Sequence, residues 1–308
     1  MRVVFVGSGE IGLPSFRLLL DAPGVEVAGL VTQPDRASGR GLKVVPSPLK
    51  QLALERGLQV LQPAKLRDES ALAEVARLEP DLLVVMAYGQ ILPPALLALP
   101  RLGAINLHAS LLPRHRGAAP VHAAILAGDE RSGVTVMWMD EGLDTGDILL
   151  ARECGIDAAE TAGSLHDKLA ALAPTALAAA LELITAGAAP RRAQDSALAT
   201  YAPKLDRASG SIDWQDGAEA IVRKIRGMHP WPGTSVDFLT GEGRTLRVKV
   251  HRAAVAPGGP AAGEIPAGSL RIGCGAGGAV DLIEVQPAGG RRMTAADFLR
   301  GHTVLRVA

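Results

Sequence analysis

The chain has 308 residues, of which 48% are apolar and 21% are charged, and its 32 basic residues balance its 32 acidic ones. This length exceeds what one hydrophobic core usually organises, so we expect two domains of a globular protein. The sequence shows no uninterrupted apolar stretch long enough to cross a membrane and no signal-type segment at its start. The two cysteines lack a metal-type spacing and exclude a disulfide framework, which favours a cytoplasmic protein without membrane contact.

The first elements predict a strand, a tight turn and a helix. An apolar strand over residues 2–6 is followed by a G-x-G-x-x-G run over 7–12, which has the form of a dinucleotide-binding turn. A nicotinamide enzyme places an acidic residue at the end of the next strand, here 25–31, to hold the ribose hydroxyls. In this chain Asp35 comes only after Pro34. We therefore interpret the glycines as a strand-to-helix turn and keep a nicotinamide dehydrogenase as the less favoured alternative.

A long loop over residues 34–48 follows. It carries Arg40 between two glycines and, a little further on, Lys43. Long loops without regular structure inside compact domains are usually functional or disordered, so this loop is a candidate binding segment. Ser47 is then expected to cap a helix that has Pro48 in its first turn.

The next elements complete an α/β pattern. We expect a short strand over 59–61, a helix over 68–78 and a strongly apolar strand over 81–86 that leaves through residues 87–93. This repeated alternation predicts a doubly wound, mainly parallel sheet, which makes the N-terminal domain Rossmann-like.

Three polar residues after the next strand are the first candidates for chemistry. An apolar run over 103–105 predicts a buried strand, and Asn106, His108 and Ser110 follow it. Period-two alternation places Asn106 and His108 on the same face of the strand end. Such strand ends bind ligands in open α/β sheets. A single histidine there is more often a structural residue, so this pattern by itself leaves both interpretations open.

The rest of the chain divides into an α/β part and a β-rich part. We expect a helix ending near Ala127, strands over 133–140 and 148–152, a turn over 141–147 and a long helix over 164–186. Beyond a polar connection the pattern changes to short β segments separated by glycine-rich turns, which predicts a small β-barrel, OB-like in type. The expected boundaries are 1–188 for the first domain, 189–204 for a linker and 205–308 for the barrel domain.

The charge is distributed unevenly along the chain. Residues 204–308 hold 14 Lys plus Arg against 10 Asp plus Glu, a net charge of +4 that the rest of the chain compensates. A basic domain on a neutral protein indicates a polyanionic partner, although chance unevenness on a solvated surface explains this count equally well.

An amide and an imidazole on one strand face can donate hydrogen bonds to a carbonyl oxygen that becomes negative during attack. Such donors are worth roughly 3 kcal/mol each when well placed. A nearby carboxylate would orient the imidazole and relay a proton, and Asp144, on a loop flanked by Gly142 and Gly146, is the best candidate. Asp140 and Asp147 are expected to be turn and capping residues. No Ser or Cys has a nucleophile-elbow context, so the set suits direct acyl transfer.

A zinc site is the alternative use of the histidines, because His108, His115 and His122 are regularly spaced. However, Pro113 and Pro120 break any continuous helix through them, and no thiolate pair supports a site. We therefore expect no catalytic metal.

The motif Asn106-x-His108, with Ser110-Leu111-Leu112-Pro113 and with Asp144 in a Gly-Leu-Asp-Thr-Gly loop, resembles the tetrahydrofolate-dependent formyltransferase superfamily. Within it, the chain is most similar to the methionyl-tRNA formyltransferase family, and the similarity spans essentially the whole chain. The folate motif is specific to the superfamily, whereas the loop around Arg40 and the C-terminal domain are specific to the tRNA enzymes. Further matching segments, in order, are 5–7, 32–36, 39–41, 46–48, 87–89, 114–120, 205–214 and 230–233.

The resemblance implies formyl transfer from 10-formyltetrahydrofolate, a co-substrate, to the α-amino group of initiator methionyl-tRNA. Asn106 and His108 would stabilise the tetrahedral oxyanion, and Asp144 would position His108 and assist proton transfer. The tRNA acceptor end would meet Arg40, Gly41 and Lys43, the basic C-terminal domain would hold the flank of the tRNA, and the family suggests a monomer. Ser110, Leu111, Leu112 and Pro113 would line the folate pocket. The backbone of two segments would hold the pterin, namely that of Met86, Tyr88, Gly89, Ile91 and Leu92 and that of Met139, Asp140 and Gly142.

Two departures from the family pattern are Ala109, where a glycine is common, and His115, where an aromatic residue is common. In addition, Ser209-Gly210-Ser211 replaces a more charged run, so individual tRNA contacts there stay unassigned. The rivals are a glycinamide ribonucleotide or amino-sugar formyltransferase and, from another class, a non-catalytic RNA-binding protein. A glycinamide ribonucleotide formyltransferase would not need the C-terminal domain. A non-catalytic RNA-binding protein would have no use for Asn106, His108 and Asp144.

Overall fold

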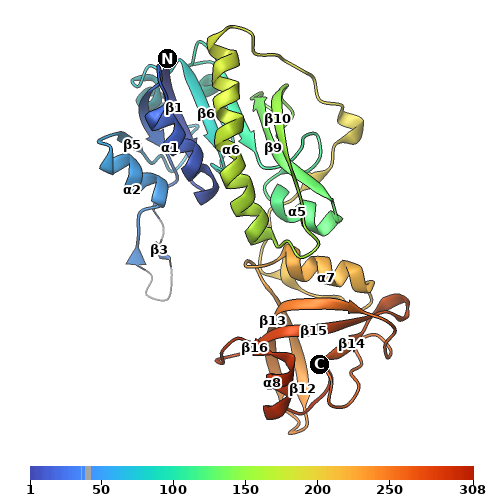
Figure 1. Ribbon diagram of the computed structural model, residues 1–308. Coiled ribbons are helices and arrows are strands. Elements are labelled where there is room, and N and C mark those ends of the chain that lie inside the picture. The colour runs from blue at the N-terminus through green and yellow to red at the C-terminus, as the bar shows by residue number, and fades with distance from the viewer. Residues whose placement is uncertain (36, 39–42) are drawn as a thin grey trace. The chain divides into compact units, whose positions relative to one another are not determined.

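The computed structural model describes residues 1–35, 37–38 and 43–308, and contacts divide the chain into two compact units (Figure 1). The first unit holds Met1–Pro120, Arg131–Gly155 and His166–Ala202, and the second holds Val121–Glu130, Ile156–Leu165 and Pro203–Ala308. Most of the connection that we expected to be a linker, up to Ala202, therefore belongs to the first unit.

The first unit is built on a seven-stranded sheet with the order β10-β9-β7-β6-β1-β2-β5. From β1 the chain proceeds outward to β2 and β5 on one side and then to β6 and β7 on the other, with all five strands parallel. Strand β9 is antiparallel to its neighbour β7, and β10 is antiparallel to β9. The strands are β1 (Arg2–Gly7), β2 (Glu26–Val31), β5 (Gln59–Leu61), β6 (Leu82–Met86), β7 (Ala104–His108), β9 (Arg131–Trp138) and β10 (Ile148–Gly155).

This topology confirms the predicted doubly wound, mainly parallel sheet. The order reverses between β1 and β6, and open α/β sheets bind ligands outside the carboxyl ends of the strands at such a reversal. The loops that follow β6 and β7 leave the sheet at this edge, and together with the ends of these two strands they contain eleven of the eighteen residues proposed from the sequence.

Helices cover both faces of the sheet because alternate side chains of each strand are buried on opposite sides. Val4 and Val6 of β1 pack in a cluster with α3 (Glu69–Ala76) and α4 (Pro94–Leu97). On the other side, the ring centroid of Phe5 lies 5.0 Å from that of Phe16 in α1 (Leu13–Asp21). Helix α6 (Ala162–Thr185) runs along the same face as α1 (Figure 1).

Helix α6 is long and apolar enough to cross a membrane by length and composition alone. Its buried residues, however, form a single stripe with helical spacing, which is the pattern of a core helix in a globular protein. The stripe consists of Ala162, Leu165, Leu169, Ala170, Ala173, Ala176, Leu177, Ala180, Leu181 and Ile184.

Two local predictions for the first unit are confirmed. Ser47 caps α2 (Pro48–Glu55) by accepting a hydrogen bond from the N–H of Lys50. The glycine run after β1 forms a tight turn, in which the N–H groups of Ser8 and Gly9 both donate to the carbonyl of Ala87 at 3.2 Å. These N–H groups therefore form hydrogen bonds within the protein, whereas a phosphate-binding turn would present them to a ligand.

Shorter elements complete the first unit. A 3-10 helix, Glu10–Gly12, directly precedes α1. The remaining elements are β3 (Ala37–Ser38), which pairs with β4 (Lys43–Val44), β8 (Arg116–Gly117), which pairs in parallel with β11 (Tyr201–Ala202), and α5 (Pro120–Ala127), whose residues from Val121 on belong to the second unit.

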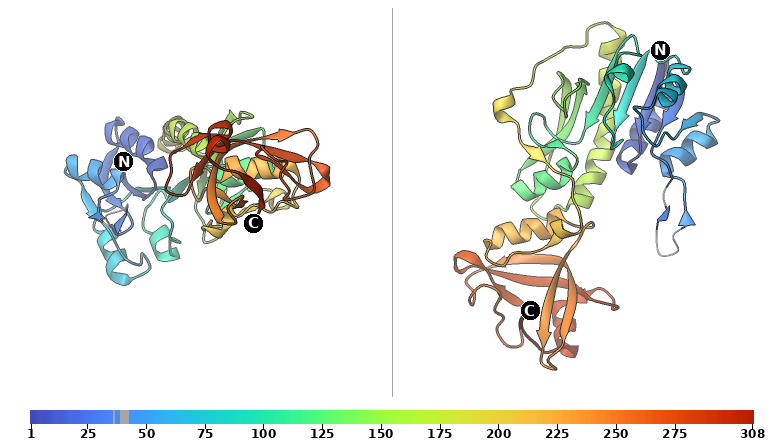
Figure 2. Two further views of the ribbon diagram at one scale, coloured as in Figure 1. Left: turned by 90° about the horizontal axis from the view of Figure 1, so that it is seen from below. Right: turned by 180° about the vertical axis from the view of Figure 1, so that it is seen from behind.

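The second unit is an antiparallel sheet that closes on itself through a short bridging segment. Its order is β14-β15-β13-β12-β17, with β16 paired to β15 (Figure 2). At the two edges of the sheet, Gly263 donates to the carbonyl of Gly273 in β14 and accepts from the N–H of Val307 in β17. The sheet is thus a small barrel, as expected. The strands are β12 (Thr234–Thr240), β13 (Thr245–Ala256), β14 (Arg271–Gly273), β15 (Ala279–Pro287), β16 (Met293–Thr294) and β17 (Val304–Val307).

Two helices pack on this barrel. The ring of Phe298 in α8 (Ala295–Gly301) lies 6.3 Å from that of Phe238 inside the barrel, and both are fully buried. Helix α7 (Ala218–Gly227) meets the residues of α5 that belong to this unit, and a Cβ on Gly227 would lie 3.1 Å from Leu126. Glycine at this position therefore allows the two helices to approach closely.

Candidate active site

The end of β7 presents two polar side chains that the core has positioned. Ile105 and Leu107 are 0% and 2% exposed, so alternation turns Asn106 and His108 to the opposite face of the strand. Strand β9 fixes the register of this end, because Asn106 pairs with Met137 and His108 pairs with Thr135. This placement is the one that the sequence predicted.

The third residue of the candidate trio lies on a tight loop after β9. Asp140 folds this loop by accepting hydrogen bonds from the N–H of Gly142 at 3.0 Å and from Oγ1 of Thr145 at 2.8 Å. A Cβ on Gly146 would lie 1.7 Å from the carbonyl oxygen of Trp138, so only glycine fits there. Asp144 itself has a φ of +53°, in the left-handed region that non-glycine residues seldom adopt.

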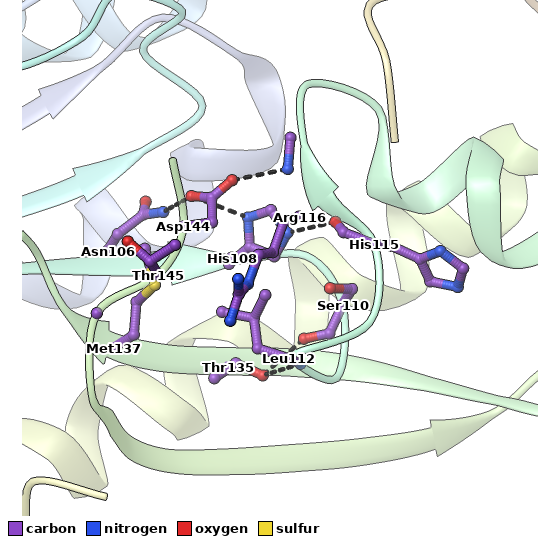
Figure 3. Close-up of polar contacts among 12 residues, drawn as sticks. Asn106, His108, Ser110, Leu112, His115, Arg116, Thr135, Met137, Asp144 and Thr145 are labelled. Carbon is purple, nitrogen blue, oxygen red and sulfur yellow. Dashed lines mark hydrogen bonds and ion pairs between the residues drawn. The ribbon is translucent and has the colours of Figure 1, made fainter. Parts of the chain in front are cut away.

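The structure brings Asn106, His108 and Asp144 together (Figure 3). Oδ1 of Asp144 lies 3.4 Å from Nδ2 of Asn106 and 3.6 Å from Nδ1 of His108. The other carboxylate oxygen accepts a hydrogen bond of 2.8 Å from the N–H of Gly117. The side chains of His108 and Asp144 are 6% and 13% exposed. Two nitrogens therefore converge on one point of a nearly enclosed site.

The protonation pattern of His108 follows from its other nitrogen. Nε2 lies 2.9 Å from the carbonyl oxygen of His115, and because a carbonyl can only accept, Nε2 carries a proton. Nδ1 faces the carboxylate of Asp144. The imidazolium form would donate from both nitrogens.

The loop after β7 is held by its own hydrogen bonds and by Thr135 of β9. The buried hydroxyl of Ser110 donates to the carbonyl of Arg114 at 2.7 Å. Oγ1 of Thr135 donates to the carbonyl of Ser110 and accepts from the N–H of Leu112, at 2.7 and 3.1 Å. Leu111 and Pro113 are half-buried. The loop over Ser110 to Pro113 is therefore held in place, with Ser110 and Leu112 buried and only Leu111 and Pro113 partly open to a ligand.

The loop after β6 presents mainly main chain. Ala87 and Gly89 have φ values of +50° and +80°. The side chains of Met86, Tyr88 and Leu92 are buried, whereas Ile91 is 80% exposed. Of the five residues proposed here from the sequence, only Gly89 and Ile91 are thus open to a ligand.

Tyr88 is turned into the core on the side of α3 and α4. Among the described residues its hydroxyl has no hydrogen-bond partner, and burial raises the pKa of Tyr88 to about 12. Its carbonyl oxygen, by contrast, accepts a hydrogen bond of 3.1 Å from Nε2 of Gln33. The ring of Tyr88 therefore packs in the core and does not face the site.

The proposed tRNA-binding residues fall on the least described part of the chain. Arg40 and Gly41 lie outside the described residues, and Lys43 begins β4. At the base of this loop Asp35 accepts a hydrogen bond of 2.5 Å from Nζ of Lys50 and one of 2.9 Å from Gln62. The hydrogen bond from Lys50 and then that from Gln62 hold the pKa of Asp35 below its usual value.

Sequence reasoning missed the contribution of residues 187–202 to this site. Thr200 accepts the N–H of Arg116 with its carbonyl, and the N–H of His115 with its hydroxyl at 2.8 Å. Gln194 contacts Arg116 and the main chain of Asp144. The segment is polar and lacks periodicity. The only available signal was its position just before residues 205–214, which resemble the family.

The three regularly spaced histidines do not form a metal site. Over residues 1–35, 37–38 and 43–308, no group of three His, Cys, Asp or Glu residues is placed to hold a metal ion. Both ring contacts of His108 are accounted for by His115 and Asp144.

Two family models match this chain. The formyl transferase family matches residues 1–181, and the formyl transferase C-terminal domain matches residues 204–303. The chain belongs to the formyl transferase family. Residues 1–181 of this formyl transferase contain the whole trio.

Two curated relatives cover nearly the whole chain. A protein of Geotalea uraniireducens named methionyl-tRNA formyltransferase is 45% identical over 307 residues, covering 99% of this chain and 96% of its own. A protein of Pseudomonas fluorescens with the same name is 48% identical over 301 residues, covering 97% of this chain and 92% of its own.

Solved structures support the fold. A sugar 3N-formyl transferase, WlaRD, has a TM-score of 0.65 at 14% identity, covering 91% of this chain and 96% of its own. HypX from Aquifex aeolicus, in complex with tetrahydrofolic acid, has a TM-score of 0.59 at 18% identity, covering 97% of this chain and 47% of its own.

Proposed function

We propose that this formyl transferase moves the formyl group of 10-formyltetrahydrofolate to the α-amino group of methionyl-tRNA, which produces the formylated initiator. One observation carries the chemistry, namely that Asn106, His108 and Asp144 converge at the end of β7. The acceptor is supported by curated relatives of 45% and 48% identity that are named for it.

In the proposed reaction the amine nitrogen attacks the formyl carbon while the carbonyl π electrons move to oxygen. Nδ2 of Asn106 and Nδ1 of His108 both face Oδ1 of Asp144, at 3.4 and 3.6 Å, so an oxyanion that forms beside this oxygen would lie within reach of both donors. A well-placed donor of this kind is worth roughly 3 kcal/mol of barrier.

Collapse of the tetrahedral intermediate breaks the bond between the formyl carbon and N10 of the folate. The amine must lose one proton and N10 must gain one, so the proton balance closes within the site. Asp144 is the group that can relay this proton, since one of its oxygens faces the reacting centre while Gly117 holds the other at 2.8 Å.

The folate co-substrate would lie against the main chain of the loops after β6 and β9. Gly89, Ile91, Asp140 and Gly142 are the exposed members of the predicted set in these loops, and the two glycines would permit close approach. The half-buried side chains of Leu111 and Pro113 would form the wall next to the transferred group.

Recognition of the tRNA is assigned to parts of the chain outside the trio. Arg40, Gly41 and Lys43 would enter the acceptor end, and residues 204–308, with their surplus of basic residues, would bind the flank. Phosphate contacts of this kind make affinity fall with rising salt. We further propose that the protein acts as a cytoplasmic monomer.

The decisive experiment gives the purified protein 10-formyltetrahydrofolate and charged initiator tRNA. Formyl-methionyl-tRNA is the expected product, with elongator methionyl-tRNA as the selectivity control. Transfer to glycinamide ribonucleotide or to an amino sugar, without transfer to the tRNA, would refute the proposed acceptor. Arg40→Ala should mainly weaken the productive use of tRNA, and an unchanged rate would contradict its role.

A further inference from the structure

Gln194 lies in the connection between α6 and β11, 50 residues beyond Asp144 in the chain. Its carbonyl oxygen accepts two hydrogen bonds from the guanidinium of Arg116, from Nε at 3.0 Å and from Nη2 at 2.8 Å. Its amide nitrogen donates to the main-chain carbonyls of Asp144 at 2.9 Å and Gly146 at 2.7 Å.

These contacts use the full hydrogen-bonding capacity of the amide, with two acceptor positions and two N–H groups. Its orientation is also fixed, because the guanidinium can only donate and the two carbonyls can only accept. A glutamate at this position could still accept from Arg116 but would turn an oxygen toward two carbonyl oxygens. An asparagine would be one methylene shorter. The side chain is half-buried, which limits competition from water.

The contacts form a closed ring around the carboxylate of Asp144. The N–H of Gly117 holds the carboxylate from one side, and the preceding residue, Arg116, extends its side chain to Gln194. Gln194 in turn holds the main chain of Asp144 from the other side. Strand β8, which contains Arg116 and Gly117, is itself paired with β11, seven residues beyond Gln194.

Asp144 needs such support because of its backbone. Its φ of +53° lies in a region that is strained for most non-glycine residues, and such strain persists only where the surroundings fix it. The core does little to fix the part of the loop around Asp144, since the adjacent Leu143 is 50% exposed.

We propose that Gln194 is a positioning residue for formyl transfer, which fixes the main chain of Asp144 and Gly146 so that the carboxylate meets Asn106 and His108. The inference rests on the proposed role of Asp144 in the reaction. Gln194 itself touches neither that carboxylate nor, in this arrangement, the point on which the two donors converge.

The test uses the full-length protein with Gln194→Met, which keeps the length and volume of the side chain but removes all four hydrogen bonds. We expect kcat to fall about tenfold to a hundredfold, as the loss of two or more hydrogen bonds would give. KM for both substrates and the melting temperature should change little. Asp195→Ala is the matched control, because the adjacent Asp195 caps only a neighbouring turn, and its kcat should stay within twofold.

Gln194→Glu is the second variant. It keeps the acceptor for Arg116, so a kcat as low as that of Gln194→Met assigns the effect to the lost donors. In an Asp144→Asn background, Gln194→Met should lower the residual rate less than twofold, because its effect passes through Asp144. An unchanged kcat in Gln194→Met, or full additivity with Asp144→Asn, would overturn the proposal.

A readout independent of activity separates this inference from the proposed function. Amide hydrogen exchange at Gly117, whose N–H is bound by the carboxylate of Asp144, should accelerate at least tenfold in Gln194→Met and stay unchanged in Asp195→Ala. Equal exchange rates of the Gly117 amide in both variants would refute the positioning role of Gln194. Should the wild-type protein formylate another amine, the proposed acceptor fails, whereas the kcat ratio can be measured with that amine.

Discussion

The trio draws its members from two regions that are held in place in different ways. Asn106 and His108 lie on β7, a strand paired on both sides and fixed by fully buried neighbours such as Ile105. Asp144 lies on a loop next to the exposed Leu143, and hydrogen bonds to residues distant in the chain hold it, among them the N–H of Gly117 and the side chain of Gln194. A group on a core strand inherits its position from the fold, whereas a group on a loop needs contacts dedicated to it.

Removing either reacting group should give the largest effect. His108→Ala and Asp144→Asn are each expected to lower kcat by roughly 10² to 10⁴-fold, because both the oxyanion donor and the proton relay depend on the pair. The double variant should fall little further, since residues that act as a unit are not additive. Single-turnover rates measure this, and the affinity for tRNA should stay within about twofold. Additive losses would indicate that the two regions act separately.

Weakening the strand should cost stability and spare the chemistry. Ile105→Ala removes a fully buried side chain and is expected to lower the free energy of unfolding by about 2 to 5 kcal/mol. The kcat of the folded protein should change less than threefold, because pairing on both sides keeps the register. Urea unfolding provides the measurement, and Leu54→Ala, at a 55% exposed position of α2, is the control with a small expected loss. A large fall in kcat would show that β7 is less firmly fixed than we infer.

Crowding the loop should affect both quantities. In Gly146→Ala the new Cβ would lie 1.7 Å from the carbonyl of Trp138, so the loop must move and take Asp144 with it. We expect a stability loss of about 1 to 3 kcal/mol together with a fall in kcat of about tenfold or more. Gly155→Ala is the matched control, because no atom lies within 4 Å of a Cβ there. Equal behaviour of the two variants would show that the loop adapts freely.

The hydrogen bonds of Asp35 should weaken in acid, whereas those of Gln194 should not, because the carboxylate of Asp35 becomes protonated and the amide of Gln194 does not. Asp35 has a pKa below its usual value in the folded protein, so its hydrogen bonds to Lys50 and Gln62 stabilise the fold fully above its unfolded pKa of about 4. This stabilisation is lost as the pH falls through the lowered folded pKa. The difference in unfolding free energy between wild type and Asp35→Asn should therefore shrink below about pH 4, whereas that between wild type and Gln194→Met should stay constant.

The same contrast explains what could be predicted from the sequence. The position of His108 followed from strand periodicity, because burial of Ile105 and Leu107 dictates it. Asp144 could be singled out because Gly142 and Gly146 flank it, and the structure shows that both glycines are required by close contacts. The parallel sheet and the barrel followed from repeated patterns of many residues.

Gln194 could not be found in this way. Its role arises from hydrogen bonds to residues 48 to 78 positions away, and a single polar side chain in a segment without periodicity carries no local signal. For the same reason the connection up to Ala202 resembled a linker, although β11 and Thr200 tie it to β8 and His115. Periodic patterns report on the core, and isolated polar contacts leave no such pattern.

The division of the chain into units has a practical consequence for work on fragments. The chain passes between the units five times, and the second unit includes residues 121–130 and 156–165. A truncated protein starting at Pro203 would uncover the α7 surface on which Leu126 rests, and Arg226 would lose the carbonyl of Glu160 that it binds at 2.7 Å. During synthesis, residues 121–130 also leave the ribosome before most of their packing partners exist. The C-terminal region is thus not a detachable module, and its affinity for RNA is best measured on the intact chain.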